Sequence, residues 1–244
     1  MPRFFASPEN IGDENIIIEG EDARHIARAL RLAVGDEIDV SGGVGTDYLC
    51  RLTKIRDEEC VAEILNSYPS KTEPPLEITL YMAYPKGDKL ETVVQKAVEL
   101  GASVIIPFES QRCIKRPAQD RAEKIGARLQ RIASEAAKQC GRGRLPSVLG
   151  AVSFDGLVSR MGGESPVLFC YEGEGTQPIK AVLDGMEVPK SLGVIVGSEG
   201  GFSREEADRL IAAGAIPVGL GPRILRCETA PAYALSAISY KFEL

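Results

Sequence analysis

The residues best suited to chemistry lie in glycine-containing loops in the second half of the chain. Gly197–Phe202 (G-S-E-G-G-F) follows an apolar run, Leu192–Val196, which is typical of a buried strand. Glycines at the carboxyl end of a strand let the backbone approach a ligand closely. The loop matches neither the G-x-G-x-x-G motif nor the phosphate-binding loop, and the carboxylate of Glu199 would repel a phosphate. It therefore favours a cationic or neutral ligand, although an ordinary strand–helix connection is the alternative for this loop by itself.

Two further loops of the same kind follow two other predicted strands. Gly219–Pro231 comes after the strand expected at 216–220, and Phe169–Gly175 comes after the strand expected at 166–170. The carboxyl ends of parallel strands meet at one edge of a sheet. Three such loops therefore predict a small-molecule site at that edge.

The counts of histidine and cysteine exclude several other kinds of site. His25 is the only histidine, and the six cysteines form no C-x-x-C pair. We therefore expect no zinc site and no Ser-His-Asp triad. Scattered cysteines are typical of reduced, buried thiols. No apolar run is long enough to span a membrane, and the first ten residues lack the pattern of a secretory signal, so we expect a cytoplasmic protein with no membrane contact.

Charge is distributed unevenly along a chain of ordinary globular composition. Hydrophobic residues make up 44% and charged residues 26% of the chain, which excludes a disordered tail. The net charge is −6, yet residues 111–144 carry +7 and residues 1–70 carry −7. Phosphate contacts depend on local cation density, so the basic stretch allows nucleic-acid binding. A solvated amphipathic helix at 119–139 is the alternative, but the following Gly-Arg-Gly-Arg at 141–144 suits a loop that binds an anion.

The first part of the chain predicts a small β-rich domain at 1–70. Asp36–Ser41, Asp47–Ile55 and Cys60–Leu65 alternate as strands do. A helix at Asp22–Leu32 would carry Arg24, Arg28 and Arg31 on or near one face, with His25 beside it. These arginines could contact nucleic acid, or they could simply be solvated.

A polar, proline-rich segment, Ser67–Pro75, is the best candidate for a linker to a second domain at 76–244. In that domain, strands expected at 76–83, 104–108, 166–170, 192–196 and 216–220 alternate with helices expected at 88–100, 119–139, 153–160, 177–183, 203–213 and 232–242. Ser203 and Glu206 form a capping box that marks one helix start. The alternation predicts an α/β domain with a largely parallel sheet.

Several motifs are spread along the chain: Arg3-Phe4-Phe5, His25 through Leu30-Arg31 to Gly35-Asp36, K-G-D-K at 86–89, Q-K-A-V-E-L-G at 95–101, E-A-A-K-Q-C-G-R at 135–142, G-S-E-G-G-F at 197–202 and L-G-P-R-I-L-R-C-E-T-A at 220–230. With them the chain resembles, nearly from end to end, the RsmE-type RNA methyltransferases of the SPOUT superfamily. That family methylates N3 of a specific uridine in bacterial 16S ribosomal RNA. One departure is Ser198, where the family usually has proline.

The resemblance implies a PUA-like β-barrel followed by a SPOUT α/β domain with a C-terminal trefoil knot. It implies S-adenosylmethionine as cofactor, bound by the backbone of the three loops. We expect no metal, because the sequence has no Cys/His cluster to hold one and such a methyl donor needs no Lewis acid. It also implies a homodimer that acts on 16S ribosomal RNA or the small ribosomal subunit. Two rival functions stay open: a SPOUT enzyme with another base or a ribose hydroxyl as its target, and a non-catalytic RNA-binding module.

The site residues that we expect fall into two groups. The candidates for cofactor binding are Phe169, Tyr171, Glu172, Val196, Gly197, Glu199, Gly200, Gly201, Leu220, Gly221, Ile224, Leu225 and Thr229. The candidates for RNA binding are Arg3, Arg24, His25, Arg28, Arg31, Lys86, Arg112, Arg142 and Arg144.

The cofactor implied by the resemblance is an activated methyl donor, so the protein must align uracil N3, methyl carbon and sulfur. N3 carries a proton that must leave; a cation could stabilise the uridine anion, and a carboxylate or water could accept the proton. Arg226 is the candidate for the first role, and Glu228 or Glu199 for the second. In an extended segment Arg226 and Glu228 would point to the same side, so an internal ion pair between them is the alternative.

Overall fold

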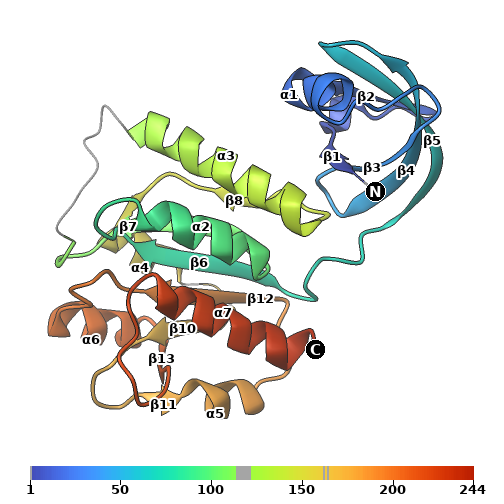
Figure 1. The fold of residues 1–244 in the computed structure, drawn as a ribbon. Helices are drawn as coiled ribbons and strands as arrows, with labels where there is room; N and C mark the ends of the chain where they lie inside the picture. The colour runs from blue at the N-terminus through green and yellow to red at the C-terminus, as the bar shows by residue number, and fades with distance from the viewer. Residues whose placement is uncertain (1, 114–121, 162, 164) are drawn as a thin grey trace. The chain divides into compact units, whose positions relative to one another are not determined.

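The alternating residues of the first domain form a five-stranded sheet in the computed structural model, which describes residues 2–113, 122–161, 163 and 165–244 (Figure 1). Its spatial order is β1 (Arg3–Phe5), β3 (Glu37–Ser41), β4 (Thr46–Ile55), β5 (Glu59–Pro69) and β2 (Asn15–Glu19). β1 pairs with β3 in parallel, and the other pairs are antiparallel. β1 and β2 are not paired with each other among the described residues. The sheet is therefore a half-barrel, whereas the resemblance implied a PUA-like β-barrel.

One helix packs on this sheet, and it differs from the single helix expected at 22–32. α1 (Gly20–Arg24) continues into a π-helical turn, η2 (His25–Ala29), and a 3-10 turn, η1 (Pro8–Asn10), precedes β2. Ala23 and Ile26 are fully buried in the core of the sheet, which anchors the helix. Arg31 lies beyond the helix in a left-handed conformation with a φ of 51°. The expected helical face through Arg31 is therefore not formed, because the wider π turn and the left-handed residue end the regular spacing.

The second sheet is parallel, as the alternation of strands and helices predicted. Its order is β11 (Gln177–Pro178), β13 (Ile216–Gly219), β10 (Val167–Cys170), β12 (Ser191–Val196), β6 (Glu77–Ala83), β7 (Ala102–Glu109) and β8 (Ser147–Val148), and β9 (Val152–Ser153) also pairs with β7. The central strands are apolar along their length because helices cover both faces. The two-residue strands were not predicted, since so short a segment shows no periodicity.

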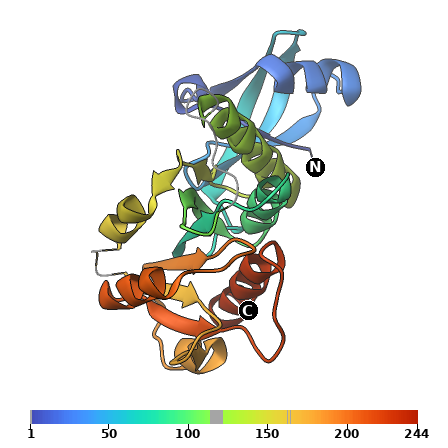
Figure 2. The ribbon, with the colours of Figure 1, turned by 90° about the vertical axis from the view of Figure 1, so that its left-hand side faces the viewer.

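Helices cover both faces of the parallel sheet. They are α2 (Lys89–Glu99), α3 (Ala122–Cys140), α4 (Phe154–Arg160), α5 (Ile179–Asp184), α6 (Arg204–Ala212) and α7 (Thr229–Phe242). α7 contacts α2, α5 and β12, whereas α4 and α6 pack with Phe108 and Phe169 in another core cluster. Figure 2 shows α7 and α6 on opposite sides of the sheet. α6 begins with the expected capping box, and α7 begins at Thr229, earlier than expected. Residues 119–121, where we expected α3 to begin, lie outside the described residues.

The chain passes between two units more than once. The first unit comprises 1–73 and 137–145, and the second comprises 74–136 and 146–244. The chain therefore leaves the first unit within the expected linker segment, Ser67–Pro75. The first three residues of that segment belong to β5, which ends at Pro69. We did not expect the return at 137–145, because it begins inside a helix that has no break in its sequence pattern.

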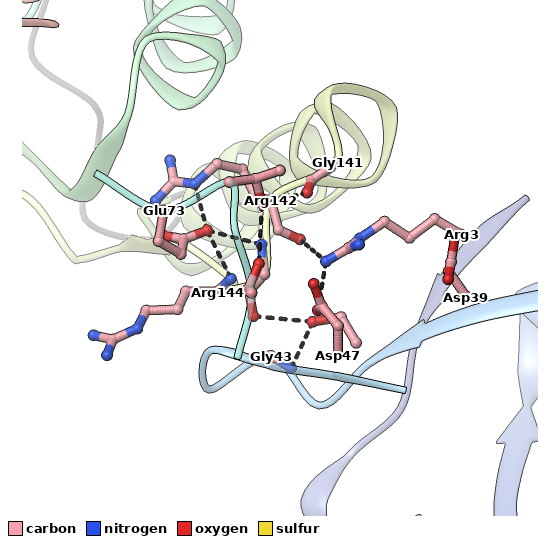
Figure 3. A network of polar contacts seen from close by, with 12 residues as sticks. Arg3, Asp39, Gly43, Asp47, Glu73, Gly141, Arg142 and Arg144 are labelled. Carbon is pink, nitrogen blue, oxygen red and sulfur yellow. Dashed lines mark hydrogen bonds and ion pairs between the residues drawn. The ribbon is translucent and has the colours of Figure 1, made fainter. Parts of the chain in front are cut away.

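The returning segment is held in the first unit by a half-buried carboxylate, whose side chain is 14% exposed. Glu73 Oε1 accepts hydrogen bonds from the backbone N–H groups of Gly143 (2.8 Å) and Arg144 (3.0 Å), and the Arg142 guanidinium donates to both carboxylate oxygens at 2.9 and 2.8 Å. A Cβ on Gly143 would lie 2.0 Å from Ser70 Oγ, so only glycine fits there. We call Glu73 and the loop 141–145 the Glu73 clasp; Figure 3 shows it.

Other contacts extend the clasp to the start of the chain. The guanidinium of Arg3 donates to Asp47 Oδ1 at 2.6 Å and to the carbonyl oxygen of Arg142 at 3.0 Å (Figure 3). Near the end of α3, Lys138 Nζ donates to Asp22 Oδ1 at 2.7 Å. The loop at 141–144 thus binds an anion, but that anion is a carboxylate of the same chain.

Glu73→Ala should lower the free energy of unfolding of the first unit by about 3 kcal/mol, because it leaves the buried Arg142 guanidinium without its counterion. Urea unfolding followed by circular dichroism measures the effect. Glu58→Ala, at an exposed position of the same unit, is the matched control and should stay within about 0.5 kcal/mol of the unsubstituted protein. A Glu73→Ala protein as stable as this control would show that the clasp does not stabilise the unit.

Candidate active site

A cavity of about 980 Å³ lies at the carboxyl ends of β10, β12 and β13. The three loops that follow these strands line it with residues 170–173, 196–202 and 219–227. Parallel pairing of β10 with both β12 and β13 brings the three strand ends together. The cavity is therefore built by the loops in which glycine recurs in the sequence.

Most residues expected to bind a cofactor line this cavity. They are Tyr171, Glu172, Val196, Gly197, Glu199, Gly200, Gly201, Leu220, Gly221, Ile224 and Leu225. Phe169 does not line it, because its ring is fully buried beneath that of Tyr171. Thr229 does not line it either, since it is the first residue of α7 and its N–H donates to the carbonyl of Arg226.

The loop after β12 can exist only with glycine at particular positions. A Cβ on Gly197 would lie 2.8 Å from the ring of Phe202, and a Cβ on Gly200 would lie 2.9 Å from Arg112 Cβ. Gly201 has a φ of 61° and donates its N–H to the carbonyl of Ser198 at 2.9 Å. The loop is thus a tight turn with bare backbone beside the cavity, as close approach by a ligand requires.

Aromatic rings form one wall of the cavity. Tyr171 stacks on Phe169 with ring centroids 5.0 Å apart, and Phe169 meets Phe202 edge to face at 4.8 Å. Tyr171 and Phe202 line the cavity, whereas Phe169 supports both from beneath. Such packed rings offer a rigid apolar surface to a ligand.

A lysine joins two loops at the rim of the cavity. Lys89 Nζ lies 2.9 Å from Glu199 Oε1 in the loop after β12 and 3.2 Å from Glu228 Oε2 at the start of α7. The backbone N–H of Lys86 also donates to both oxygens of Glu199, at 3.1 and 3.2 Å. The thiol of Cys227 donates to Glu228 Oε2 at 3.3 Å. The two carboxylates are therefore fixed by donors from the β6–α2 segment and from the last loop.

These contacts alter the acidity of the cluster. Partial burial, the largest single effect, raises the pKa of Glu199, but the hydrogen bonds from Lys89 and the backbone together outweigh it and lower the pKa to about 2. Hydrogen bonding, first from its own backbone, lowers the pKa of Glu228. Burial raises the pKa of the Cys227 thiol to about 12. At neutral pH the cluster therefore holds two carboxylates, one ammonium and a neutral thiol.

The three catalytic candidates lie in different surroundings. Arg226 lines the cavity, is exposed and forms no ion pair with any described residue. The expected alternative, an ion pair between Arg226 and Glu228, is not formed, because Glu228 pairs with Lys89. Glu228 has helical dihedral angles, so the segment is not extended. The expectation that the side chains of Arg226 and Glu228 point to the same side therefore does not apply. Because its pKa is so low, Glu199 is a weak base and a poor proton acceptor.

The expected RNA-binding residues divide into exposed and internally bound groups. Arg24, His25, Arg28, Arg31 and Arg144 are exposed on the first unit, and Lys86 is exposed on the second. Arg28 pairs with Asp57, and its guanidinium stays at the surface.

Arg3 and Arg142 have other roles, because both guanidinium groups are used inside the first unit. The side chain of Arg142 is only 4% exposed, against 15% for Arg3. Arg112 lines the cavity, where its guanidinium donates to the carbonyl of Gly200 at 3.0 Å. Arg112 thus supports the loop after β12.

The sequence did not single out Lys89 or Cys227 as site residues. Lys89 lies in the K-G-D-K segment, whose lysines signalled basic character but not their partners. Its contacts with Glu199 and Glu228 join residues more than a hundred positions apart, which no local pattern reveals.

Two further observations concern only the described parts of the chain. No helix there is long and apolar enough to cross a membrane. Residues 2–113, 122–161, 163 and 165–244 also contain no cluster of three or more His, Cys, Asp or Glu side chains that could hold a metal ion.

Comparison with known families identifies both parts of the chain. Residues 72–239 match the model of an RNA methyltransferase domain, and residues 18–65 match that of an RNA methyltransferase PUA domain. Ribosomal RNA small subunit methyltransferase E of Bacillus subtilis is 36% identical over 93% of this chain and 90% of its own length. The enzyme of the same name from Synechocystis is 33% identical over 99% of this chain and 78% of its own length.

A solved structure shares the fold. The crystal structure of ribosomal RNA small subunit methyltransferase E from Neisseria gonorrhoeae, bound to S-adenosyl methionine, superposes with a TM-score of 0.85 and 34% sequence identity. It covers 98% of this chain, and this chain covers 97% of it. With matches of this extent in both sequence and fold, the chain belongs to the family of ribosomal RNA small subunit methyltransferase E.

Proposed function

We propose that this chain transfers a methyl group from S-adenosylmethionine to N3 of a specific uridine in 16S ribosomal RNA. The observation that carries the proposal is the glycine-lined cavity at the carboxyl edge of the parallel sheet, in a chain of this family. Loss of N3-methyluridine from 16S RNA in a strain that lacks the gene, and its restoration by the purified protein with S-adenosylmethionine, is the expected result. A methylated ribose or another methylated base would favour the rival target, and no methylation would favour a binding module.

The cavity fits the proposed cofactor. The positive φ of Gly201 and the close contacts of Gly197 and Gly200 leave bare backbone to meet a polar ligand. Tyr171 and Phe202 supply flat apolar surface for a planar group such as adenine. Residues of all three loops would hold the cofactor, chiefly through backbone groups.

When bound, S-adenosylmethionine supplies a methyl group already activated on a sulfonium. The chain has then to hold the uracil edge in line and to favour loss of the N3 proton. Arg226 is the proposed cation for the developing uridine anion, because its guanidinium lines the cavity without a described partner. Glu228 is the remaining carboxylate candidate for the proton, with solvent as its alternative, whereas Glu199 holds the loop.

We propose that the exposed side chains of Arg24, His25, Arg28, Arg31 and Arg144 in the first unit, and of Lys86 in the second, bind RNA. Their exposure at the surface supports this role. The whole-chain charge of −6 does not oppose it, since phosphate contacts depend on local charge.

We also infer a homodimer and a trefoil knot, both implied by the family resemblance, and action in the cytoplasm. Tyr233 and Tyr240 are two helical turns apart on α7 and are 44% and 76% exposed, and Ile224 in the preceding loop is 84% exposed. A second copy packed on this helix would bury this apolar surface. The knot would involve the loops after β12 and β13.

Gly201→Val should weaken S-adenosylmethionine binding at least tenfold, because a branched side chain at a positive φ distorts the turn and projects beside the cavity. Isothermal titration calorimetry measures the affinity. Gly214→Val is the matched control: Gly214 also has a positive φ with open space around its Cβ, but it lies outside the cavity lining. Equal affinities for the two variants would contradict the assignment of this loop.

Arg226→Lys should reduce turnover at least tenfold, because lysine keeps the charge but loses the planar fork of donors. Cofactor affinity and the melting temperature should hardly change. Raising the pH should reduce the difference in turnover between Arg226→Lys and the unsubstituted protein, since solvent then removes the N3 proton more readily.

Arg160→Lys, on the exposed surface of α4, is the control for this exchange and should keep full turnover. If Arg226→Lys instead melts several degrees lower while each folded molecule keeps its turnover, the role of Arg226 is structural.

A further inference from the structure

The position of Lys89 between two carboxylates affects the electrostatic potential in the cavity. Lys89 is the first residue of α2, and its ammonium lies within 3.2 Å of oxygens from both Glu199 and Glu228. Lys89 and Glu199 both line the cavity. The side chains of Lys89, Glu199 and Glu228 are 32%, 28% and 23% exposed, so solvent screens their charges only in part.

Removing the Lys89 ammonium would make the electrostatic potential in the cavity more negative. The cluster has one positive charge for two negative ones. The lining also contains Arg112, Arg204, Arg223 and Arg226 and the carboxylate of Glu172. Whatever their sum, loss of one positive charge makes the cavity more attractive to a cation and changes little for a neutral group.

The proposed cofactor and its demethylated product differ in the charge on their sulfur atom. S-adenosylmethionine carries a positive sulfonium, whereas S-adenosylhomocysteine has a neutral thioether and otherwise the same charged groups. A charged side chain in the cavity therefore affects the two affinities differently. A purely structural tether between the loops would affect them alike.

We propose that Lys89 is a positioning residue that holds Glu199 and Glu228 and, by balancing their charge, limits how strongly the cavity prefers the methyl donor over the demethylated product. With one ammonium beside two carboxylates, the cluster keeps a net negative charge that attracts a sulfonium but does not bind other cations strongly. The inference rests on the proposed function, because it takes S-adenosylmethionine as the cofactor.

The test is calorimetric titration of the full-length protein with S-adenosylmethionine and with S-adenosylhomocysteine. Lys89→Met should raise the ratio of the product Kd to the donor Kd about fivefold, as expected for one unit charge acting across a partly solvated cavity. Added salt should shrink this shift. Lys89→Arg should leave the ratio unchanged.

Two controls separate charge from structure. Lys96→Met makes the same substitution on α2 at an exposed lysine that pairs with Glu99 and does not line the cavity, so it should leave the ratio unchanged. The double variant Lys89→Met with Glu199→Gln removes one charge of each sign, so the ratio should return to within twofold of the original. If Lys89→Met does not fold, Lys89→Gln keeps a donor beside both carboxylates and should give the same shift.

An unchanged ratio in Lys89→Met, whatever happens to the two affinities separately, would overturn the inference and leave Lys89 as a simple tether. A shift that persists in the double variant would also overturn it, because the effect would then not follow the net charge. Failure of the unsubstituted protein to bind S-adenosylmethionine at all would instead refute the proposed function.

Discussion

Parallel pairing around β10 and β12 is the constraint on which the site depends. β12 pairs with β6 on one side and with β10 on the other, and β10 also pairs with β13. Each of these strands must end at the same edge, so the loops that follow them are brought together although they are far apart in sequence. The apolar runs that bury the strands between two layers of helices therefore also determine where the cavity forms.

Each unit uses the same local device to fix a loop: an internal carboxylate held by one basic side chain and by backbone N–H groups. In the first unit the carboxylate is Glu73, bound by Arg142 and the backbone of 143–144. In the second it is Glu199, bound by Lys89 and the backbone of Lys86. In the clasp the Arg142 guanidinium is buried and both oxygens of Glu73 accept hydrogen bonds, which suits a structural role. The Glu199 cluster is partly open to solvent and lines a cavity, which suits a role in ligand binding.

Local patterns predicted the strands β3 to β7, β10, β12 and β13, the glycine loops and the capping box of α6, because each depends on residues close together in sequence. They missed β1 and β2 and the two-residue strands. They could not predict the partners of Glu73 or Lys89, because those contacts join residues 69 or more positions apart. The helix at α1 was predicted in place but not in form, since the burial of Ala23 and Ile26 and the left-handed Arg31 depend on the sheet beneath. The return of 137–145 to the first unit was not predicted either, because it depends on contacts with Glu73, which is far away in sequence.

The arginines show why charge along a sequence overstates the charge offered to RNA. The stretch 111–144 carries +7, yet Arg142 is neutralised by Glu73 and Arg112 donates to the backbone of Gly200. Arginine on glycine-rich backbone suits a phosphate and an internal carboxylate equally well, because a tetrahedral phosphate and a planar carboxylate both present a pair of oxygen acceptors that the guanidinium fork can bind. Burial distinguishes the two cases: a guanidinium that is 4% exposed already has its anion, whereas the exposed Arg24 of α1 keeps the capacity to bind one. Arg28 of η2 pairs with Asp57 but stays at the surface.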